Sequence, residues 1–123
     1  MSSSNEKITH DFQNKYSLEE RKIESANIMK RYPNRIPVIV ESDSFTLDKK
    51  KFLVPNVTTI SQFLYIIRKR LKIAHESAIF LFFNNNTLLA STTLMSQAYK
   101  DHKHTDSFMY TKLCNENVFG SKN

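Results

Sequence analysis

Glycine is almost absent from this chain of 123 residues, in which Gly120 is the only one. Average usage would give roughly eight or nine glycines. The turns of the fold must therefore rely on other residues, and Asn, Asp and Pro are the expected substitutes. A glycine kept only near the end of the chain favours chemistry there, because a residue without a Cβ enters narrow channels and leaves its carbonyl unhindered. A chance glycine in a polar tail is the alternative.

Cysteine and long apolar segments are also scarce. Cys114 is the only cysteine, which excludes a disulfide within the chain and fits a reducing compartment. The longest apolar run, Ala78–Phe83, is far too short to cross a bilayer, and Met1–Lys15 is too polar for a secretory signal. We therefore expect a protein that is soluble when made and that reaches a membrane only through a later attachment.

The residues that are present suit one domain with one core. Hydrophobic residues make up 40% of the chain, and nine Phe and five Tyr fill the space that the missing tryptophan would take. The formal net charge of +6 favours an acidic partner, which is a lipid surface, a nucleic acid or an acidic peptide.

The first half of the chain predicts two helices and two strands. A short helix over residues 8–15 has Phe12 as its one bulky anchor. The next helix starts at Ser17, which has capping-box spacing to Glu20, and ends at Tyr32, because the residue before a proline avoids helical angles. The strands are Arg35–Glu41 and Lys51–Val54, joined by the polar residues 43–50 and stopped by Pro55.

The second half predicts a helix with Thr59 as its N-cap and residues 68–70 facing mostly outward. Its apolar stripe is Phe63, Ile66, Ile67 and Leu71. The short apolar run Ala78–Phe83 predicts a strand buried on both faces. The remaining elements are a turn over residues 84–86, a brief strand at Leu88-Leu89, a helix from Thr92 or Thr93, and a last strand over Phe108–Leu113.

This order, two helices and then β-β-α-β-(β)-α-β, predicts an α+β fold in which a mixed sheet wraps across one main helix, the β-grasp. The Ser-rich start, residues 1–7, is expected to be disordered, residues 8–114 form the domain, and residues 115–123 form a flexible tail. The order of the strands in the sheet does not follow from periodicity.

Several segments together resemble one family. They are RYPNRIPVIVE (Arg31–Glu41), DKKKFLVP (Asp48–Pro55), QFLYIIRKRL (Gln62–Leu71), AIFLFFNN (Ala78–Asn85) and NVFG (Asn117–Gly120). The family is that of the autophagosomal ubiquitin-like modifiers, which include the GABA-A-receptor-associated protein and microtubule-associated protein light chain 3. The resemblance covers residues 12–120, and it is specific because the motifs occur in the family's order and spacing.

The resemblance implies a ubiquitin-like β-grasp with two additional N-terminal helices. It also implies a cycle in which a cysteine protease cuts the Gly120-Ser121 bond, activating and conjugating enzymes carry the glycine carboxylate, and an amide forms with phosphatidylethanolamine. The covalent lipid on Gly120 takes the place of a cofactor. By the same resemblance the chain is cytoplasmic when soluble, and it lies on autophagosomes and on vacuolar or lysosomal membranes when lipidated.

Two hydrophobic pockets also follow from the resemblance, for cargo receptors and adaptors that carry short acidic aromatic-x-x-aliphatic motifs. The aromatic pocket maps to Glu24, Ile28, Pro37, Lys51, Leu53 and Phe108. The aliphatic pocket maps to Phe52, Val54, Pro55, Phe63, Ile66 and Ile67. Arg70 matches a family arginine that pairs with acidic residues of partners, the protease included. From the residues alone, ordinary core positions are the alternative for the apolar members.

Lys51–Val54 is expected to be an exposed sheet edge to which a peptide adds as a strand, and the lysines at 49–51 favour acidic peptides. The sequence departs from the family at Thr58, where a leucine is usual beside the aliphatic pocket, which predicts a shallower or more polar pocket. Other departures are the short Ser42–Leu47 loop, Leu89-Ala90 in place of a diproline, and Ser17 in place of a frequent proline.

Other classes of function fit the sequence less well. The four histidines do not complete a tetrahedral Cys/His set, so no metal site is predicted, and Cys114 has no convincing histidine partner. We therefore interpret the chain as a substrate and adaptor and not as an enzyme. A basic nucleic-acid-binding domain using Lys49–Lys51 and Arg68–Lys72 would lack a recognisable reading motif. A peptide-binding scaffold that is never conjugated keeps both pockets and leaves Gly120 silent.

Overall fold

The computed structural model describes residues 11–84 and 86–116. Within them a four-stranded sheet has the order β2-β1-β4-β3, in which the central β1–β4 pair is parallel and both outer pairs are antiparallel. The strands are β1 (Arg35–Glu41), β2 (Lys51–Pro55), β3 (Ile79–Phe83) and β4 (Met109–Asn115). Strand β4 thus reaches one residue into the predicted tail.

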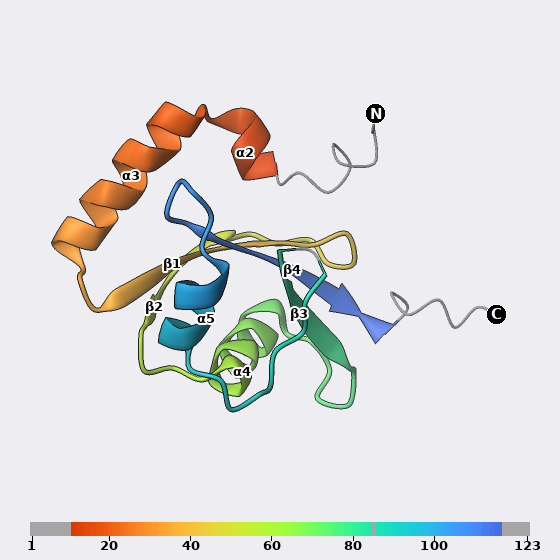
Figure 1. Cartoon of the computed structure of the whole chain (residues 1–123). Helices are drawn as coiled ribbons and strands as arrows, with labels where there is room; N and C mark the ends of the chain where they lie inside the picture. The colour runs from red at the N-terminus through yellow and green to blue at the C-terminus, as the bar shows by residue number, and fades with distance from the viewer. Residues whose placement is uncertain (1–10, 85, 117–123) are drawn as a thin grey trace.

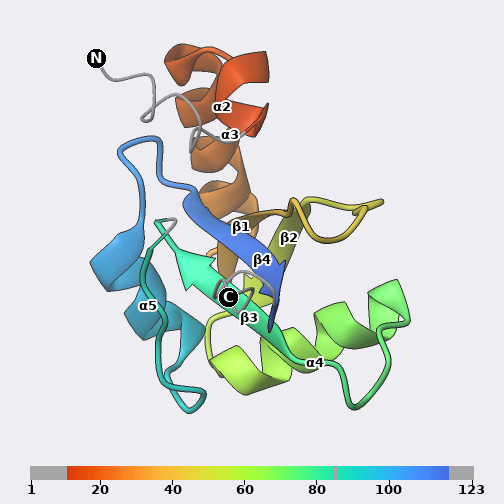
Figure 2. The same cartoon turned by 90° about the vertical axis from the view of Figure 1, so that its right-hand side faces the viewer.

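Helices cover both faces of this sheet (Figure 1, Figure 2). They are α2 (Asp11–Lys15), α3 (Leu18–Arg31), α4 (Ile60–Leu71) and α5 (Met95–His102). Helices α4 and α5 pack on one face, whereas α2 and α3 lie against the other. The β-grasp with two additional N-terminal helices that the sequence predicts is therefore confirmed.

Strand β1 is apolar on both faces because each face has its own helical cover. Successive side chains of a strand point to opposite faces, so Val38 and Val40 join the main core with α4 and α5, while Ile39 belongs to a second cluster. This second cluster consists of Ile39, Phe108 and Tyr110, with Phe12 and Ile28 packed against it. The anchor expected at Phe12 is confirmed, since its ring centroid lies 5.1 Å from that of Phe108.

Helices α3 and α4 begin where the sequence predicts. The Ser17 hydroxyl accepts from Glu20 N at 3.1 Å, and Glu20 Oε1 accepts from Ser17 N at 2.8 Å. Thr59 and Gln62 form the same capping box at the start of α4. Each box satisfies two backbone N–H groups that would otherwise have no partner within the helix.

Helix α5 begins later than the predicted start at Thr92 or Thr93. Its first residue is Met95, and no side chain caps it. The backbone before it is held in an extended pairing, because the carbonyl of Thr93 accepts from Ile60 N at 2.9 Å. Pairing with the start of α4 thus overrides the capping preference of the two threonines.

Two expectations around β3 are wrong. Leu88-Leu89 forms no strand, and Thr87 alone bridges back to Phe83. Only one face of β3 is fully buried, whereas Phe80 and Phe82 are half-buried on the other. The reason is that β3 lies at an edge of the sheet, and the second cluster under α2 and α3 contains no β3 residue.

Arg68 is only partly exposed, whereas the basic run predicts a side chain that faces mostly outward. Its side chain is half-buried, and Nη1 donates to the carbonyls of Ala74 at 2.9 Å and Ser77 at 2.7 Å. This arginine therefore holds the loop between α4 and β3. Lys69 and Arg70 are exposed, as expected.

The turns lack glycine but not positive φ angles. Among the described residues, left-handed backbone occurs at Lys72 (φ 55°), Asn84 (φ 54°) and Ser107 (φ 72°). Asparagine was an expected substitute, whereas lysine and serine were not. A side chain with a Cβ costs roughly 1–2 kcal/mol in this conformation, so at least two turns carry strain that glycine would remove.

Replacing Lys72 by glycine should raise the free energy of unfolding by about 1 kcal/mol. Lys72 caps α4 in the left-handed conformation, and its N–H bonds to carbonyls of the last turn. Urea denaturation measures the change. Lys69→Gly is the matched control, because it places glycine inside the helix and should lower stability by about 1 kcal/mol. A Lys72→Gly protein that is less stable than the wild type would contradict this reading.

Candidate functional site

Strand β2 is an edge of the sheet, as the sequence predicts. It pairs with β1 on one side, with Leu53 opposite Pro37. Its other side carries no strand among residues 11–84 and 86–116. Such an edge presents a row of backbone N–H and C=O groups to which an extended peptide can add.

The residues of the aromatic pocket come from α3, β1, β2 and the position before β4. Glu24 and Ile28 lie one helical turn apart on α3, so they share a face. Glu24 forms an ion pair with Lys51 of β2, and Ile28 packs against the second cluster, which contains Phe108. The structure therefore brings Glu24 and Ile28 of α3 next to Lys51 and the cluster of Phe108, while Leu53 lies half-buried opposite Pro37 in the β1–β2 pair.

An open hollow of about 880 Å³ runs along α3 beside this position. It is lined by Glu20, Ile23, Glu24, Asn27, Ile28, Lys30, Arg31 and Tyr32. Ile23 is 56% exposed and was not singled out from the sequence. Ile23 is five positions from Ile28 and does not share its face of α3, so it gives no periodic signal and its part in the hollow could not be found from the sequence.

The residues of the aliphatic pocket divide between core and surface. Four of them are buried in the main core, namely Phe52, Val54, Phe63 and Ile67. The rings of Phe52 and Phe63 meet edge to face with centroids 5.5 Å apart. Pro55 is exposed and Ile66 is 46% exposed, so these two residues are the accessible members.

A second hollow, of about 540 Å³, opens beside Ile66. Its lining is Thr58, Ser61, Gln62, Tyr65 and Ile66. Four of these five side chains carry a hydroxyl or an amide, and Thr58 is one of them. An aliphatic side chain that docks here would therefore meet polar groups as well as Ile66 and Tyr65.

Arg70 already has a partner within the chain. Its Nε lies 3.2 Å from Asp48 Oδ1 and its Nη2 lies 3.4 Å from Oδ2. Both side chains are largely exposed, and exposed ion pairs contribute little to stability. An acidic group of a partner can thus replace Asp48 at low cost.

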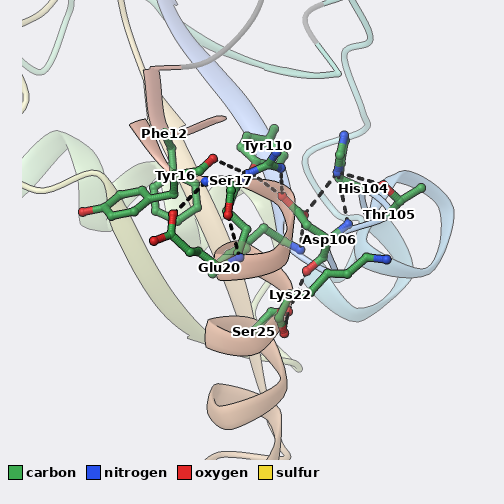
Figure 3. A network of polar contacts seen from close by, with 12 residues as sticks. Phe12, Tyr16, Ser17, Glu20, Lys22, Ser25, His104, Thr105, Asp106 and Tyr110 are labelled. Carbon is green, nitrogen blue, oxygen red and sulfur yellow. Dashed lines mark hydrogen bonds and ion pairs between the residues drawn. The ribbon is translucent and has the colours of Figure 1, made fainter. Parts of the chain in front are cut away.

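A buried polar network joins α3 to the loop before β4 (Figure 3). Arg21 forms an ion pair with Asp106, and the Tyr110 hydroxyl donates to the same carboxylate oxygen at 2.6 Å. Burial alone would lower the pKa of Arg21, but its interactions with Asp106 and Tyr110 outweigh burial and raise it. Burial raises the pKa of the Tyr110 phenol, and the hydrogen bond to Asp106 raises it further.

The free energy of unfolding should fall as the pH rises above about 10. Unfolded tyrosine loses its proton there, whereas burial raises the pKa values of Tyr110 and Tyr99 and keeps both protonated in the folded state. The folded state then binds more protons than the unfolded state, so stability present below that pH is lost above it. Urea titrations at pH 8 and about pH 10.5 test this. Tyr110→Phe should reduce the fall of the free energy of unfolding between these pH values, while Tyr65→Phe, at an exposed position, should not. Equal stability at both pH values would contradict it.

The described part of the chain offers little support for a metal site, a cysteine nucleophile or a membrane-spanning helix. Residues 11–84 and 86–116 hold no group of three or more His, Cys, Asp or Glu side chains arranged for a metal ion. Burial raises the pKa of the Cys114 thiol, which makes it a poor nucleophile. No helix in these ranges has the length and apolar character to cross a bilayer. Gly120, where the sequence predicts chemistry, lies outside the described residues.

Comparison with known proteins gives consistent matches. A family model described as "Autophagy protein Atg8 ubiquitin like" matches residues 20–120. Autophagy-related protein 8 of Mycosarcoma maydis is 49% identical over 113 residues, which is 89% of this chain and 95% of that protein. Autophagy-related protein 8a of Arabidopsis thaliana is 50% identical over 108 residues, covering 85% and 88% of the two chains. The crystal structure of Trypanosoma brucei ATG8 matches with a TM-score of 0.82 at 36% identity, over 88% of this chain and 96% of that one.

Proposed function

Because the chain belongs to the Atg8 ubiquitin-like family of autophagy proteins, we propose that it is a modifier that is cut after Gly120 and joined through that glycine to phosphatidylethanolamine. The observation that carries the proposal is that the family match, residues 20–120, ends at the one glycine of the chain. Ser121–Asn123 lie beyond the match, and they are the residues that cleavage would remove.

The chemistry proceeds by acyl transfer. A cysteine protease hydrolyses the Gly120-Ser121 amide, with water supplying the new carboxylate oxygen. An activating enzyme adenylates the carboxylate with ATP and releases pyrophosphate. A cysteine thiolate then displaces AMP to form a thioester, and the acyl group passes to a cysteine of the conjugating enzyme, which frees the first thiol. The amine of phosphatidylethanolamine attacks the thioester carbonyl, an amide forms, and the thiol leaves with a proton. Gly120 suits each step because no Cβ hinders its carbonyl.

The folded domain serves as substrate and adaptor in this proposal, without a bound cofactor and without catalysis of its own. Residues 8–114 form the ubiquitin-like unit, with 1–7 and 115–123 as flanking segments. On autophagosomal and vacuolar or lysosomal membranes, the β2 edge and the aromatic and aliphatic pockets recruit cargo receptors and adaptors. The open edge of β2 and the hollow along α3 support peptide docking.

Intact-mass measurement of the protein from cells with autophagy induced tests the proposal. We expect a soluble form that ends at Gly120, and a membrane form heavier by one phosphatidylethanolamine less one water. If every cellular form retained Asn123, the processing step would be wrong. The scaffold that binds peptides without conjugation would then take its place, since the β2 edge favours it independently.

Nucleic-acid binding is less favoured because the sequence carries no recognisable reading motif. The ion pairs Lys50–Asp11, Lys51–Glu24 and Arg70–Asp48 do not decide between the two functions, since a phosphate and an acidic peptide would displace the same carboxylates. A salt titration separates the two readings, because phosphate binding weakens steeply with salt and docking in apolar pockets does not.

A further inference from the structure

Asp106 is completely buried, and each of its polar atoms has a partner (Figure 3). Its N–H donates to His104 Nδ1 at 3.1 Å, and its carbonyl accepts from Ser25 Oγ at 2.6 Å. Its carboxylate accepts from Phe108 N at 2.9 Å, from the Tyr110 hydroxyl at 2.6 Å and from Arg21. Asp106 therefore joins helix α3 to the start of β4 at a single residue.

The same residue fixes the position of Phe108. Ser107, between the two, has a left-handed backbone that a serine does not favour, and its carbonyl accepts from Tyr99 Oη at 2.7 Å. The Phe108 carbonyl accepts from His104 N at 2.8 Å, and its N–H is held by the Asp106 carboxylate. Phe108 thus enters the second cluster from a tight loop that Asp106 closes.

The other end of the network lies on the helix that forms the opposite wall of the aromatic pocket. Arg21 and Ser25 are one turn apart on α3 and are its buried residues. From the same helix, Glu24 forms an ion pair with Lys51, and Ile28 packs against the cluster that contains Phe108. A bond from Arg21 or Ser25 to Asp106 therefore sets the separation between α3 and Phe108.

Stability alone is a weak explanation for this pair. Replacing a buried ion pair by apolar residues of similar size is often neutral or stabilising, because the desolvation cost cancels the attraction. Apolar contacts, unlike hydrogen bonds, do not depend on the direction of approach. The fixed geometry of a carboxylate with three donors holds two elements at one spacing, which close packing of isoleucine and phenylalanine does not specify by itself.

We propose that Arg21 and Asp106 are positioning residues for peptide recognition, which set the depth of the aromatic pocket and thereby its preference for a large aromatic side chain. This inference rests on the proposed function, since it assumes that acidic aromatic-x-x-aliphatic peptides dock on β2. The pair touches no peptide. It acts through Phe108 on one side and through α3 on the other.

The absence of tryptophan from the chain makes the test direct, because a tryptophan in the peptide is the only one in the complex. Three short acidic peptides are used, with Trp-x-x-Leu, Phe-x-x-Leu and Trp-x-x-Val. Calorimetry measures their affinities, and the emission maximum of the peptide tryptophan reports its burial. Wild-type binding of these peptides tests the proposed function by itself.

Asp106→Asn should lower affinity for the Trp-x-x-Leu peptide by about tenfold, which is within the range for coupled neighbouring groups. The ratio of affinities for Trp over Phe should shrink, and the blue shift of the tryptophan should decrease. The ratio for Leu over Val should stay unchanged, because the aliphatic pocket is formed elsewhere. A purely structural role would move neither ratio. Tyr110→Phe is the matched control, since it removes one donor to Asp106 and keeps the ion pair.

Asp106→Asn leaves Arg21 buried without its counter-ion, so the single variant can fail to fold. The double variant Arg21→Met with Asp106→Asn removes both charges and is expected to fold. It too should lose the preference for tryptophan. Folded variants that kept the Trp-over-Phe ratio would overturn the inference and leave the proposed function standing. A wild-type protein that bound none of the peptides would overturn both.

Discussion

Gly120→Ala should leave the protein diffuse and off membranes, with its fold and its peptide binding intact. The rival explanation for membrane attachment is the net charge of +6. Basic side chains near anionic lipid contribute about 1 kcal/mol each, and salt screens them within a Debye length. A two-chain lipid is stronger, because each buried CH₂ contributes about 0.8 kcal/mol and two chains anchor stably. Insertion of the lipid chains therefore contributes more free energy than the surface charge does, so loss of Gly120 should abolish attachment.

Flotation of membranes after a high-salt wash measures this. The wild-type pool should survive the wash and be released by a delipidating protease. A chain that ends at Gly120 is the matched control, and it should attach without prior cleavage because Ser121–Asn123 are already gone. If the Gly120→Ala protein still floated with membranes after the wash, conjugation would not be the means of attachment.

Leu53→Ala should lower the affinity for acidic aromatic-x-x-aliphatic peptides by roughly thirtyfold or more, since truncating a central contact costs about 2 kcal/mol of binding free energy. Phe52 and Val54 point into the main core, so Leu53, between them on β2, points toward the opposite face. It is half-buried and can lose its side chain without opening the core. Phe108→Ala is the less informative variant, because truncating a fully buried phenylalanine to alanine lowers the free energy of unfolding by about 3–5 kcal/mol.

Calorimetry on folded Leu53→Ala protein provides the measurement. Val57→Ala is the control, since Val57 is 72% exposed and lies outside both pockets. Its affinity should equal that of the wild type. Unchanged binding by Leu53→Ala would remove Leu53 from the aromatic pocket, and the peptide would have to dock elsewhere than on β2.

Periodicity and turn chemistry were enough to locate most elements. The capping box at Ser17, the N-cap at Thr59, the strand before Pro55 and the helix stripe around Phe63 followed from local rules. The strand order did not, because pairing of β1 with β4 depends on tertiary contacts. The burial of both faces of β3 was predicted wrongly for the same reason, since a short apolar run has the same sequence pattern in a central strand and in an edge strand.

The candidate site was harder to predict than the fold. An apolar stripe has the same spacing whether it lines a pocket or fills a core, and the structure places Phe63 and Ile67 in the core while leaving Ile66 at the surface. Arg21 and Asp106 gave no signal at all. They are 85 positions apart, and a charged residue on a polar helix reads as solvated until the fold buries it.

The parallel pair at the centre of the sheet also bears on how fast the chain can fold. Ile39 and Thr111, which are 72 positions apart, are joined by a hydrogen bond of 3.0 Å. The β1–β2 hairpin closes a short loop and can form locally, whereas β3 and β4 are separated by residues 84–108, α5 included, and the β1–β4 pair closes a longer loop still. Such high contact order slows the search for the native topology, and the β1–β2 hairpin cannot bury its apolar face until β1 pairs with β4. The open β2 edge is therefore most exposed to mispairing with other chains during that interval.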